Sequence, residues 1–255
     1  ADFLAWLKAQ AKLRPVFNSP ELMAWNMDKK YLADLGDAGV PVVPTLYLHN
    51  EAPEQDEDLF KKAFEQWAAP VVLKPAISAG ARDTFLLQSR EDLTRPLVGA
   101  NGQFDGDWSG FRQGRSFLLQ PFLAEVRDQG EWSCLFFDQV YSHSLLKRPG
   151  ADSWLVQDEL GGSVHWDDPP VEVVEVAKLA SESLEKAFVQ ETSKEFVAPL
   201  YTRVDIIPTG KGPLIGEVEL IEPELFFLSR SASGKAPYVP AIELFMAGLE
   251  RRLGS

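Results

Sequence analysis

The sequence has only one cysteine and three histidines among its 255 residues, and this scarcity limits its chemistry. The single cysteine, Cys134, cannot form an internal disulfide. Its neighbours at 135–137, Leu-Phe-Phe, favour a buried strand thiol over a nucleophile. The three histidines share no metal-ligand spacing and are His49, His143 and His165. The sequence therefore does not indicate a zinc site or a Ser-His-Asp triad.

The chain also lacks a long apolar run and an excess of positive charge. No stretch approaches the ~20 apolar residues that span a bilayer. The first residues, Ala-Asp-Phe-Leu, lack the basic region of a signal peptide, so we expect a cytoplasmic protein. The net charge of -13 argues against nucleic acid or an anionic membrane as a partner. A polyanionic ligand would need lysines placed around it.

The composition that remains, 45% hydrophobic and 25% charged residues, is that of a globular protein. Apolar periodicity predicts helices over Asp2–Leu13, Met27–Ala38, Asp58–Ala69, Val171–Phe188 and Ala236–Leu253. It predicts strands over Val71–Leu73, Thr84–Leu87, Phe117–Leu119, Trp132–Phe137 and Val140–Leu146. Strands dominate the middle and helices bracket them, which predicts an α+β fold with a mainly antiparallel sheet in each half.

Three local signals refine this outline. Asn26 is a good N-cap for the helix expected at Met27, and Pro121 should leave the sheet because it cannot donate to a ladder. Asn101–Gly114 is rich in glycine and is expected to be a mobile loop. Ala151–Trp166 has too many turn residues for a regular element, and its length suits a lid over a site.

The strand Val71–Leu73 ends at Lys74 and is followed by the small residues of 76–81. A turn without large side chains allows backbone N–H groups to approach a phosphate closely. The GxxxxGK[ST] pattern of a Walker loop is missing. An ordinary hairpin turn is the alternative interpretation.

The stretch Tyr201–Phe227 predicts a β-hairpin that carries acids. Apolar residues at 204–207 and 214–220 indicate two strands, and Thr-Gly-Lys-Gly at 209–212 supplies the turn. Glu217 and Glu219 are two apart and share a face at about 7 Å, with Asp205 able to lie across from them. Oxygen ligands of this kind suit Mg²⁺ or Mn²⁺ and a phosphate-transfer site. The alternative is an edge strand with solvated acids.

Six segments together resemble the ATP-grasp superfamily in order and spacing, over nearly the whole chain. These are Asp28-Lys29 before VPVVPT, then VVLKPAISAGA, LLQPFLAEV, GEWS, YTRVDII and GEVELIEP. The chain is most similar to the branch with glutathione synthetases, D-alanyl-D-alanine ligases, ribosomal-protein modification enzymes and the cycloserine-forming ligase. Members usually carry a further N-terminal domain before the helix expected at Met27, so we expect that domain to be missing or truncated here.

The resemblance implies two subdomains with a nucleotide cleft between them. It implies N-terminal helices over 1–45, a first ATP-grasp subdomain with the phosphate loop over 46–123, and a second with the metal-binding hairpin over 124–255. It also implies that two lysines hold the ATP phosphates, that a small loop closes over them, and that the connector after Phe117–Leu119 meets the adenine and the ribose. The implied ATP-binding residues are Lys29, Lys74, Ser78, Ala79, Gly80, Gln120, Phe122, Leu123 and Glu125.

The resemblance further assigns the acids and the basic residues of the hairpin region. It implies that Asp205, Glu217 and Glu219 bind Mg²⁺ or Mn²⁺, although many relatives have asparagine at the position of Glu219. Arg203 matches an arginine that contacts the transferred phosphoryl group, and Lys74 and Lys147 are the other implied catalytic residues. In a purely structural role, Arg203 would instead pair with an acid of the hairpin.

The implied activity is an ATP-dependent ligase that forms ADP. In this reaction a carboxylate of an amino acid or peptide-like molecule becomes an acyl phosphate, and an amine or another nucleophile then displaces phosphate. The expected partners are ATP and small-molecule carboxylate and amine substrates, without nucleic acid or membrane, and a homodimer is left open. Two alternatives are an ATP-grasp module that binds nucleotide without ligation and a metal-dependent hydrolase.

Overall fold

The computed structural model describes residues 2–68, 70–95, 97–98, 105–106, 108–151, 153–156, 161–227 and 239–254. The chain forms two compact units. Unit 1 consists of Ala1–Val42, Gln129–Arg148 and Ser163–Ser255, and unit 2 of Val43–Asp128 and Pro149–Gly162. The first 42 residues therefore share a unit with the acidic hairpin. Each unit has an antiparallel sheet with helices, so the predicted α+β class is confirmed.

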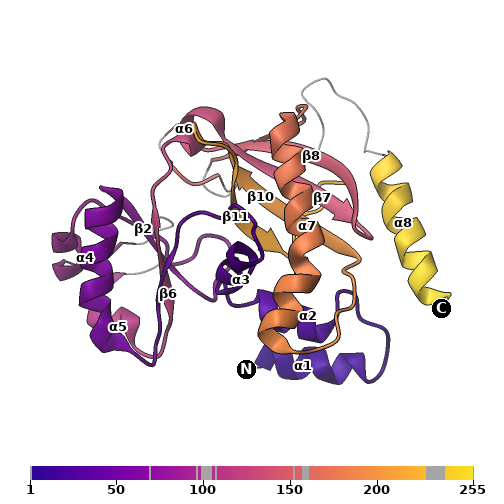
Figure 1. Ribbon diagram of the computed structural model, residues 1–255, viewed down its shortest axis with the longest axis horizontal. Coiled ribbons are helices and arrows are strands. Elements are labelled where there is room, and N and C mark those ends of the chain that lie inside the picture. The colour runs from indigo at the N-terminus through magenta and orange to yellow at the C-terminus, as the bar shows by residue number, and fades with distance from the viewer. Residues whose placement is uncertain are drawn as a thin grey trace. The chain divides into compact units, whose positions relative to one another are not determined.

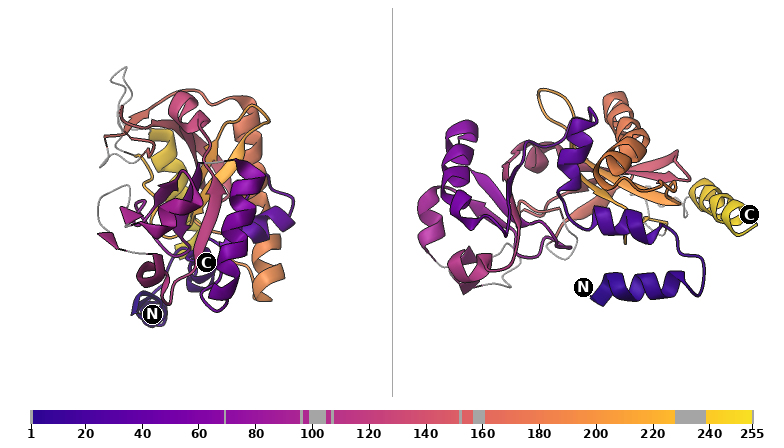
Figure 2. Two further views of the ribbon diagram at one scale, coloured as in Figure 1. Left: turned by 90° about the vertical axis from the view of Figure 1, so that its left-hand side faces the viewer. Right: turned by 60° about the horizontal axis from the view of Figure 1, so that its bottom comes forward.

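Unit 1 is built on a five-stranded antiparallel sheet in the order β11-β10-β7-β8-β9. The strands are β7 (Glu131–Phe137), β8 (Val140–Arg148), β9 (Ser163–His165), β10 (Tyr201–Ile207) and β11 (Leu214–Glu219). The helices are α1 (Asp2–Ala11), α2 (Pro20–Asn26), α3 (Tyr31–Asp37), α7 (Val171–Thr192) and α8 (Val239–Leu253). Helix α7 runs along the sheet and packs against α3 (Figure 1), and α1 lies beside α2 (Figure 2).

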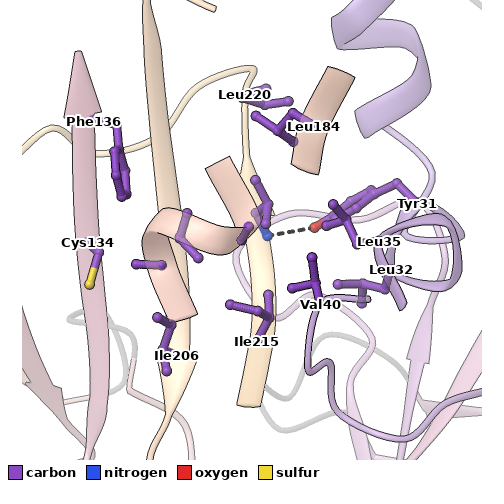
Figure 3. Packing of buried hydrophobic residues seen from close by; sticks show 14 of the residues in the cluster. Tyr31, Leu32, Leu35, Val40, Cys134, Phe136, Leu184, Ile206, Ile215 and Leu220 are labelled. Atoms are coloured by element: carbon purple, nitrogen blue, oxygen red, sulfur yellow. Dashed lines mark hydrogen bonds between the residues drawn. The ribbon is translucent and has the colours of Figure 1, made fainter. Parts of the chain in front are cut away.

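The core of unit 1 lies between the sheet and these helices (Figure 3). Alternate residues of three neighbouring strands, Cys134, Val204 and Val218, point into it, as the two-residue period of a strand requires. Cys134 is fully buried, and burial raises the pKa of its thiol to about 12. The interpretation of this cysteine as a buried strand thiol is therefore confirmed. In each of these strands, the residues directly before and after the named one point to the opposite face of the sheet.

Unit 2 is built on a four-stranded antiparallel sheet in the order β1-β6-β2-β3, with α4 packed against it (Figure 2). Its strands are β1 (Leu46–Leu48), β2 (Val71–Pro75), β3 (Phe85–Leu87) and β6 (Phe117–Pro121), with a separate pair β4 (Leu97–Val98) and β5 (Asp105–Gly106). Its helices are η1 (Pro53–Gln55), α4 (Asp56–Trp67), η2 (Arg90–Thr94), α5 (Trp108–Arg112) and α6 (Glu125–Gln129). Aromatic residues such as Phe60, Phe111 and Phe117 fill its core.

The helix predicted over Met27–Ala38 is wrong at its start. Asn26 is the last residue of α2, and α3 begins only at Tyr31. The Asn26 side chain hydrogen-bonds the backbone of β11 and therefore does not cap a helix. The backbone N–H of Lys30 donates to Asp28 Oδ1, which closes a turn between the two helices.

Three loop predictions also need correction. Pro121 stays in the sheet as the last residue of β6, opposite Val71. The stretch Asn101–Gly114 contains α5, because Phe111 is buried in the core of unit 2. The stretch Ala151–Trp166 contains β9, which pairs with β8. The remaining parts of these two stretches at 101–104, 107, 152 and 157–160 lie outside the described residues, as does the predicted helix start at 236–238.

Within the described ranges, no helix has the length and apolar character needed to cross a membrane.

Candidate active site

The link between α2 and α3 is fixed to the outer strand of the unit 1 sheet. Asn26 Nδ2 donates to the carbonyl of Val218 (2.8 Å), and Asn26 Oδ1 accepts from the N–H of Leu220 (2.9 Å). The N–H of Val218 donates to the Tyr31 hydroxyl (2.8 Å; Figure 3). These bonds give hydrogen-bond partners to backbone groups at the open edge of β11. They also hold Lys29 beside that strand, because Lys29 lies between Asn26 and Tyr31 in the sequence.

The β10–β11 hairpin brings four charged residues to one face of the sheet. Asp205 lies opposite Glu217, and Arg203 lies opposite Glu219, as cross-strand partners. The side chains of Val204 and Val218 between them point into the core. The predicted hairpin, and the prediction that Asp205 lies across from the acids of the second strand, are confirmed.

Arg203 joins two of these acids through its planar guanidinium group. Its Nε donates to Asp205 Oδ1 and its Nη2 to Asp205 Oδ2, both at 3.0 Å. The same Nη2 donates to Glu219 Oε1 on the neighbouring strand. Lys29 holds the remaining acid, with its Nζ 3.1 Å from Glu217 Oε1.

Lys147 on β8 reaches the same cluster from the other side. Its Nζ lies 2.5 Å from Glu131 Oε1, its cross-strand partner on β7, and 3.2 Å from Asp205 Oδ2. The Ser133 hydroxyl donates to Asp205 Oδ1 at 2.6 Å. Glu131 and Ser133 were not among the predicted site residues. The predicted strand began one residue after Glu131, but both residues lie in the GEWS segment, and their spacing of two, which places them on one face of a strand, was the available signal.

The charges of the cluster shift the pKa values of its members. Burial alone would raise the pKa of Asp205, but Arg203 and Lys147 outweigh it and hold that pKa below its usual range. Burial, opposed by Arg203 and reinforced by the nearby Asp205 and Glu217, raises the pKa of Glu219 to about 8. Burial also raises the pKa of Glu131, which Lys147 opposes. The cluster thus holds four carboxyl groups against three cations.

The donor set fits a hard divalent ion, because carboxylate oxygens in a negatively charged site are the ligands that Mg²⁺ prefers. The present arrangement of the side chains does not form such a site. Among the described residues, no three histidine, cysteine, aspartate or glutamate side chains are grouped so that they could hold a metal ion. The carboxylates are turned toward Arg203, Lys29 and Lys147.

The predicted phosphate-binding residues of unit 2 lie at and after the end of β2. Lys74 is half-buried in β2, where it lies opposite Leu118 of β6. The Ser78 hydroxyl donates to the carbonyl of Pro75 at 3.3 Å. Gly80 has a φ of 60°, in the left-handed region that glycine adopts at little cost. The strand and the small-residue turn are therefore where the sequence predicted them.

The predicted adenine-binding segment follows β6 in the same unit. The Phe122 N–H donates to the carbonyl of Pro70 at 3.0 Å, so this donor is already used. Gln120 is buried, and its Nε2 donates to Thr45 Oγ1 at 2.9 Å. Leu123 is half-buried, and Glu125 is the first residue of α6. Of the predicted site residues, the structure brings Lys29, Lys147, Arg203, Asp205, Glu217 and Glu219 together in unit 1.

No family model matches the sequence. The chain is 30% identical over 236 residues to the cycloserine biosynthesis protein DcsG of Streptomyces lavendulae, a match that spans 88% of this chain and 72% of that protein. Against the crystal structure of D-cycloserine synthetase DcsG, the TM-score is 0.71 at 27% identity, with 99% of this chain and 78% of that chain covered.

Two further solved structures share the fold at lower identity. D-alanine–D-alanine ligase from Bacillus anthracis complexed with ATP gives a TM-score of 0.62 at 17% identity, covering 97% of this chain and 74% of that one. The ATP-grasp ligase PsnB complexed with a minimal precursor gives 0.57 at 18% identity, covering 94% and 66%. The sequence match to DcsG, the shared fold and the resemblance of the six segments agree. The chain belongs to the ATP-grasp ligases.

Proposed function

We propose that this ATP-grasp ligase activates the carboxylate of an amino acid or peptide-like small molecule as an acyl phosphate and transfers it to an amine or another nucleophile. The observation that carries the proposal is the cluster of Arg203, Lys147 and Lys29 with acids on one face of the unit 1 sheet. The names of two relatives, D-cycloserine synthetase and D-alanine–D-alanine ligase, support a substrate related to an amino acid.

In the first step, a carboxylate oxygen would attack the γ-phosphorus of ATP while the bond to the bridging oxygen of ADP breaks. In the second step, the lone pair of an amine would attack the acyl carbon, phosphate would leave with the oxygen to which it is bound, and the amine would lose a proton. Both steps pass negative charge through the phosphoryl oxygens. Buried cations that are already in position before the reaction lower the activation barrier for such a phosphoryl transfer.

We assign these roles to particular residues. Arg203 is 8% exposed and Lys147 is 9% exposed, so both charges act in a partly desolvated environment, where they stabilise a developing anion more than in water. Lys29, Lys74 and the turn Ser78–Gly80 would bind the phosphates. The connector residues Gln120, Phe122, Leu123 and Glu125 would bind the nucleoside, with Phe122 using its carbonyl because its N–H is taken.

ATP-grasp ligases use ATP and Mg²⁺. We propose that Asp205, Glu217 and Glu219 hold the ion, which when bound would offset the charge of the phosphates. The observation that supports these three carboxylates as ligands is that they lie on one face of the sheet. Ser133 and Lys147 would keep Asp205 oriented through the hydrogen bond and the ion pair described above.

A second candidate function is a nucleotide-binding module that does not ligate. The observation that favours it is the use of Arg203 in ion pairs with Asp205 and Glu219, which is also what a structural role would require. The two functions differ in one measurable outcome. A ligase releases ADP only when a suitable carboxylate is present, whereas a binding module holds ATP without releasing ADP.

The test offers the protein ATP and Mg²⁺ with a panel of amino acids and short peptides, first as carboxylates alone and then with amines. ADP release is followed by a coupled assay, and products are identified by mass spectrometry. With an ¹⁸O-labelled carboxylate, an acyl phosphate must pass one ¹⁸O into the released phosphate. ADP release without ¹⁸O transfer contradicts the acyl phosphate. ATP binding by calorimetry without ADP release for any member of the panel favours the binding module.

A further inference from the structure

Each carboxylate that we assign to the metal is already held by a cation of the protein itself. Arg203 binds both oxygens of Asp205 and reaches Glu219, and Lys29 binds Glu217. Arg203 thus bridges two proposed ligands on neighbouring strands. A planar guanidinium suits this role, because its N–H donors in a fixed fork bind both oxygens of Asp205 at once.

The consequence of these ion pairs is visible in the arrangement of the acids. Their cross-strand register places them on one face, yet in the described part of the chain no three acids are grouped as metal ligands. The side chains are turned toward Arg203 and Lys29 rather than toward a common point. A metal ion could therefore use these carboxylates only after the guanidinium and the ammonium groups had moved away.

We propose that the ligand-free protein blocks its own metal ligands with Arg203 and Lys29, so that metal and nucleotide bind together and not separately. The inference rests on the proposed function of this cluster. A divalent ion added alone would have to compete with Arg203 and Lys29 for the carboxylates that these cations already hold. Adding the nucleotide supplies phosphate oxygens, to which Arg203 and Lys29 can turn while the metal takes the carboxylates.

Glu219 strengthens this block. An asparagine in place of Glu219 would be a neutral amide and would not form an ion pair with Arg203. The carboxyl group of Glu219 instead gives the guanidinium a second oxygen acceptor beside Asp205. Glu219 therefore helps to hold the competing arginine in place beside Asp205.

Mn²⁺ binding without nucleotide tests the proposal, because the electron paramagnetic resonance signal of free Mn²⁺ is lost on binding. The wild-type protein should bind Mn²⁺ weakly alone and far more tightly with ADP, once the signal lost to the Mn²⁺–ADP complex in a protein-free sample is subtracted. Arg203→Gln and Lys29→Gln should each bind Mn²⁺ without nucleotide at least about 10-fold more tightly than the wild type, since a competing cation is gone. The matched control is Arg251→Gln, whose arginine pairs with Asp138, and it should bind Mn²⁺ like the wild type.

Lys29→Gln keeps the test valid if Arg203→Gln does not fold, because Lys29 lies in the link before α3 and not in the sheet. Two results would overturn the proposal: wild-type protein that binds Mn²⁺ equally well with and without ADP, or folded variants that bind Mn²⁺ no more tightly than the wild type. Neither measurement needs turnover. If no substrate gave ADP release but Mn²⁺ binding still depended on ADP and on the two cations, the proposed ligase function would be rejected. The inference about metal binding would stand.

Discussion

Asn26 donates a 2.8 Å hydrogen bond to the carbonyl of Val218, and through this bond a residue at the end of a helix pairs with the outer strand of the sheet. The carboxamide behaves like a short piece of a sixth strand, because it also accepts from the N–H of Leu220. Glu217 and Glu219 flank Val218 along β11. The Asn26 carboxamide therefore helps to fix the proposed metal ligands, together with the Tyr31 hydroxyl and the pairing with β10.

We expect Asn26→Ala to lower the free energy of unfolding by about 2–4 kcal/mol, because two buried backbone groups lose their partners. Urea unfolding followed by circular dichroism measures the loss. The control is Asn50→Ala, whose exposed side chain accepts a 3.3 Å hydrogen bond from the Ser116 hydroxyl, and it should lower the free energy of unfolding by well under about 1 kcal/mol. Equal losses in the two variants would contradict the role given to Asn26.

Gly130 precedes the strand that carries Glu131, and it has a φ of +80°. A Cβ atom there would lie 2.5 Å from the backbone carbonyl oxygen of Lys147, a contact that cannot be relieved without moving β8. Gly130→Ala should therefore lower the free energy of unfolding by more than about 3 kcal/mol. Gly161 has a nearly identical φ of +83°, and no atom of the described residues lies within 4 Å of its Cβ position. Gly161→Ala should lower the free energy of unfolding by only about 1–2 kcal/mol, from backbone strain alone. The difference between the two variants then measures the steric clash at Gly130.

The stability of unit 1 should depend on pH through His143. Its ring stacks on Trp166 with centroids 5.2 Å apart, and burial lowers its pKa from 6.5 to about 4, against a hydrogen bond with the backbone of Leu225 that raises it. Between these values the unfolded chain binds a proton that the folded protein does not, so stability rises with pH from 4 to 6.5 and is complete above.

The size of this effect can be measured by comparison with His143→Phe, which keeps an aromatic ring but cannot titrate. Between pH 7 and pH 5 the wild type should lose roughly 2 kcal/mol more of its unfolding free energy than the variant. Chemical unfolding at several pH values provides both curves. Parallel curves would show that His143 does not titrate differently in the folded state.

Arg203→Ala separates catalysis from binding. If the guanidinium acts mainly on the transferring phosphoryl group, ATP affinity should stay within a few-fold of the wild type, whereas carboxylate-dependent ADP release should fall by on the order of 10²-fold or more. Steady-state kinetics and calorimetry give the two quantities. A variant that turns over normally would remove Arg203 from the mechanism, and one that only unfolds would support the structural role.

Lys74→Ala should weaken ATP binding, because a phosphate loses a charged partner in a partly buried site. Isothermal calorimetry in the presence of Mg²⁺ measures the loss, and a second titration with EDTA shows how much of the binding depends on metal. Lys211→Ala is a suitable control, since Lys211 is an exposed residue of the β10–β11 turn. ATP binding that is unchanged in Lys74→Ala would remove this lysine from the proposed site.

The sequence predicted the elements whose signals are local. The hairpin at Tyr201–Ile207 and Leu214–Glu219 has a two-residue period and a glycine-rich turn, and these features place Asp205 opposite Glu217. Helix α7 was predicted at Val171 and extends to Thr192, because its apolar stripe is long and regular. The resemblance to the ATP-grasp ligases depended on six segments in the right order and spacing, because no single segment is specific to the family.

The features that were missed depend on distant partners or on irregularities. Asn26 looks like a helix cap, and nothing nearby in the sequence shows that its partner is β11. Counting back from the turn at Asp138 would place Glu131 opposite Leu146. A register shift after Leu135 places it opposite Lys147 instead, and this shift creates the buried ion pair.

A second register shift lies in the acidic hairpin, where Asp205 pairs with Glu217 but Ile206 pairs with Ile215. Gly216 is the extra residue, and it interrupts the alternation, so that Ile215 lies in the core while Glu217, two residues on, lies on the opposite face. Deleting Gly216 would leave the acids on one face and Ile215 in the core, whereas deleting Val218 would turn every residue on one side of the gap to the opposite face.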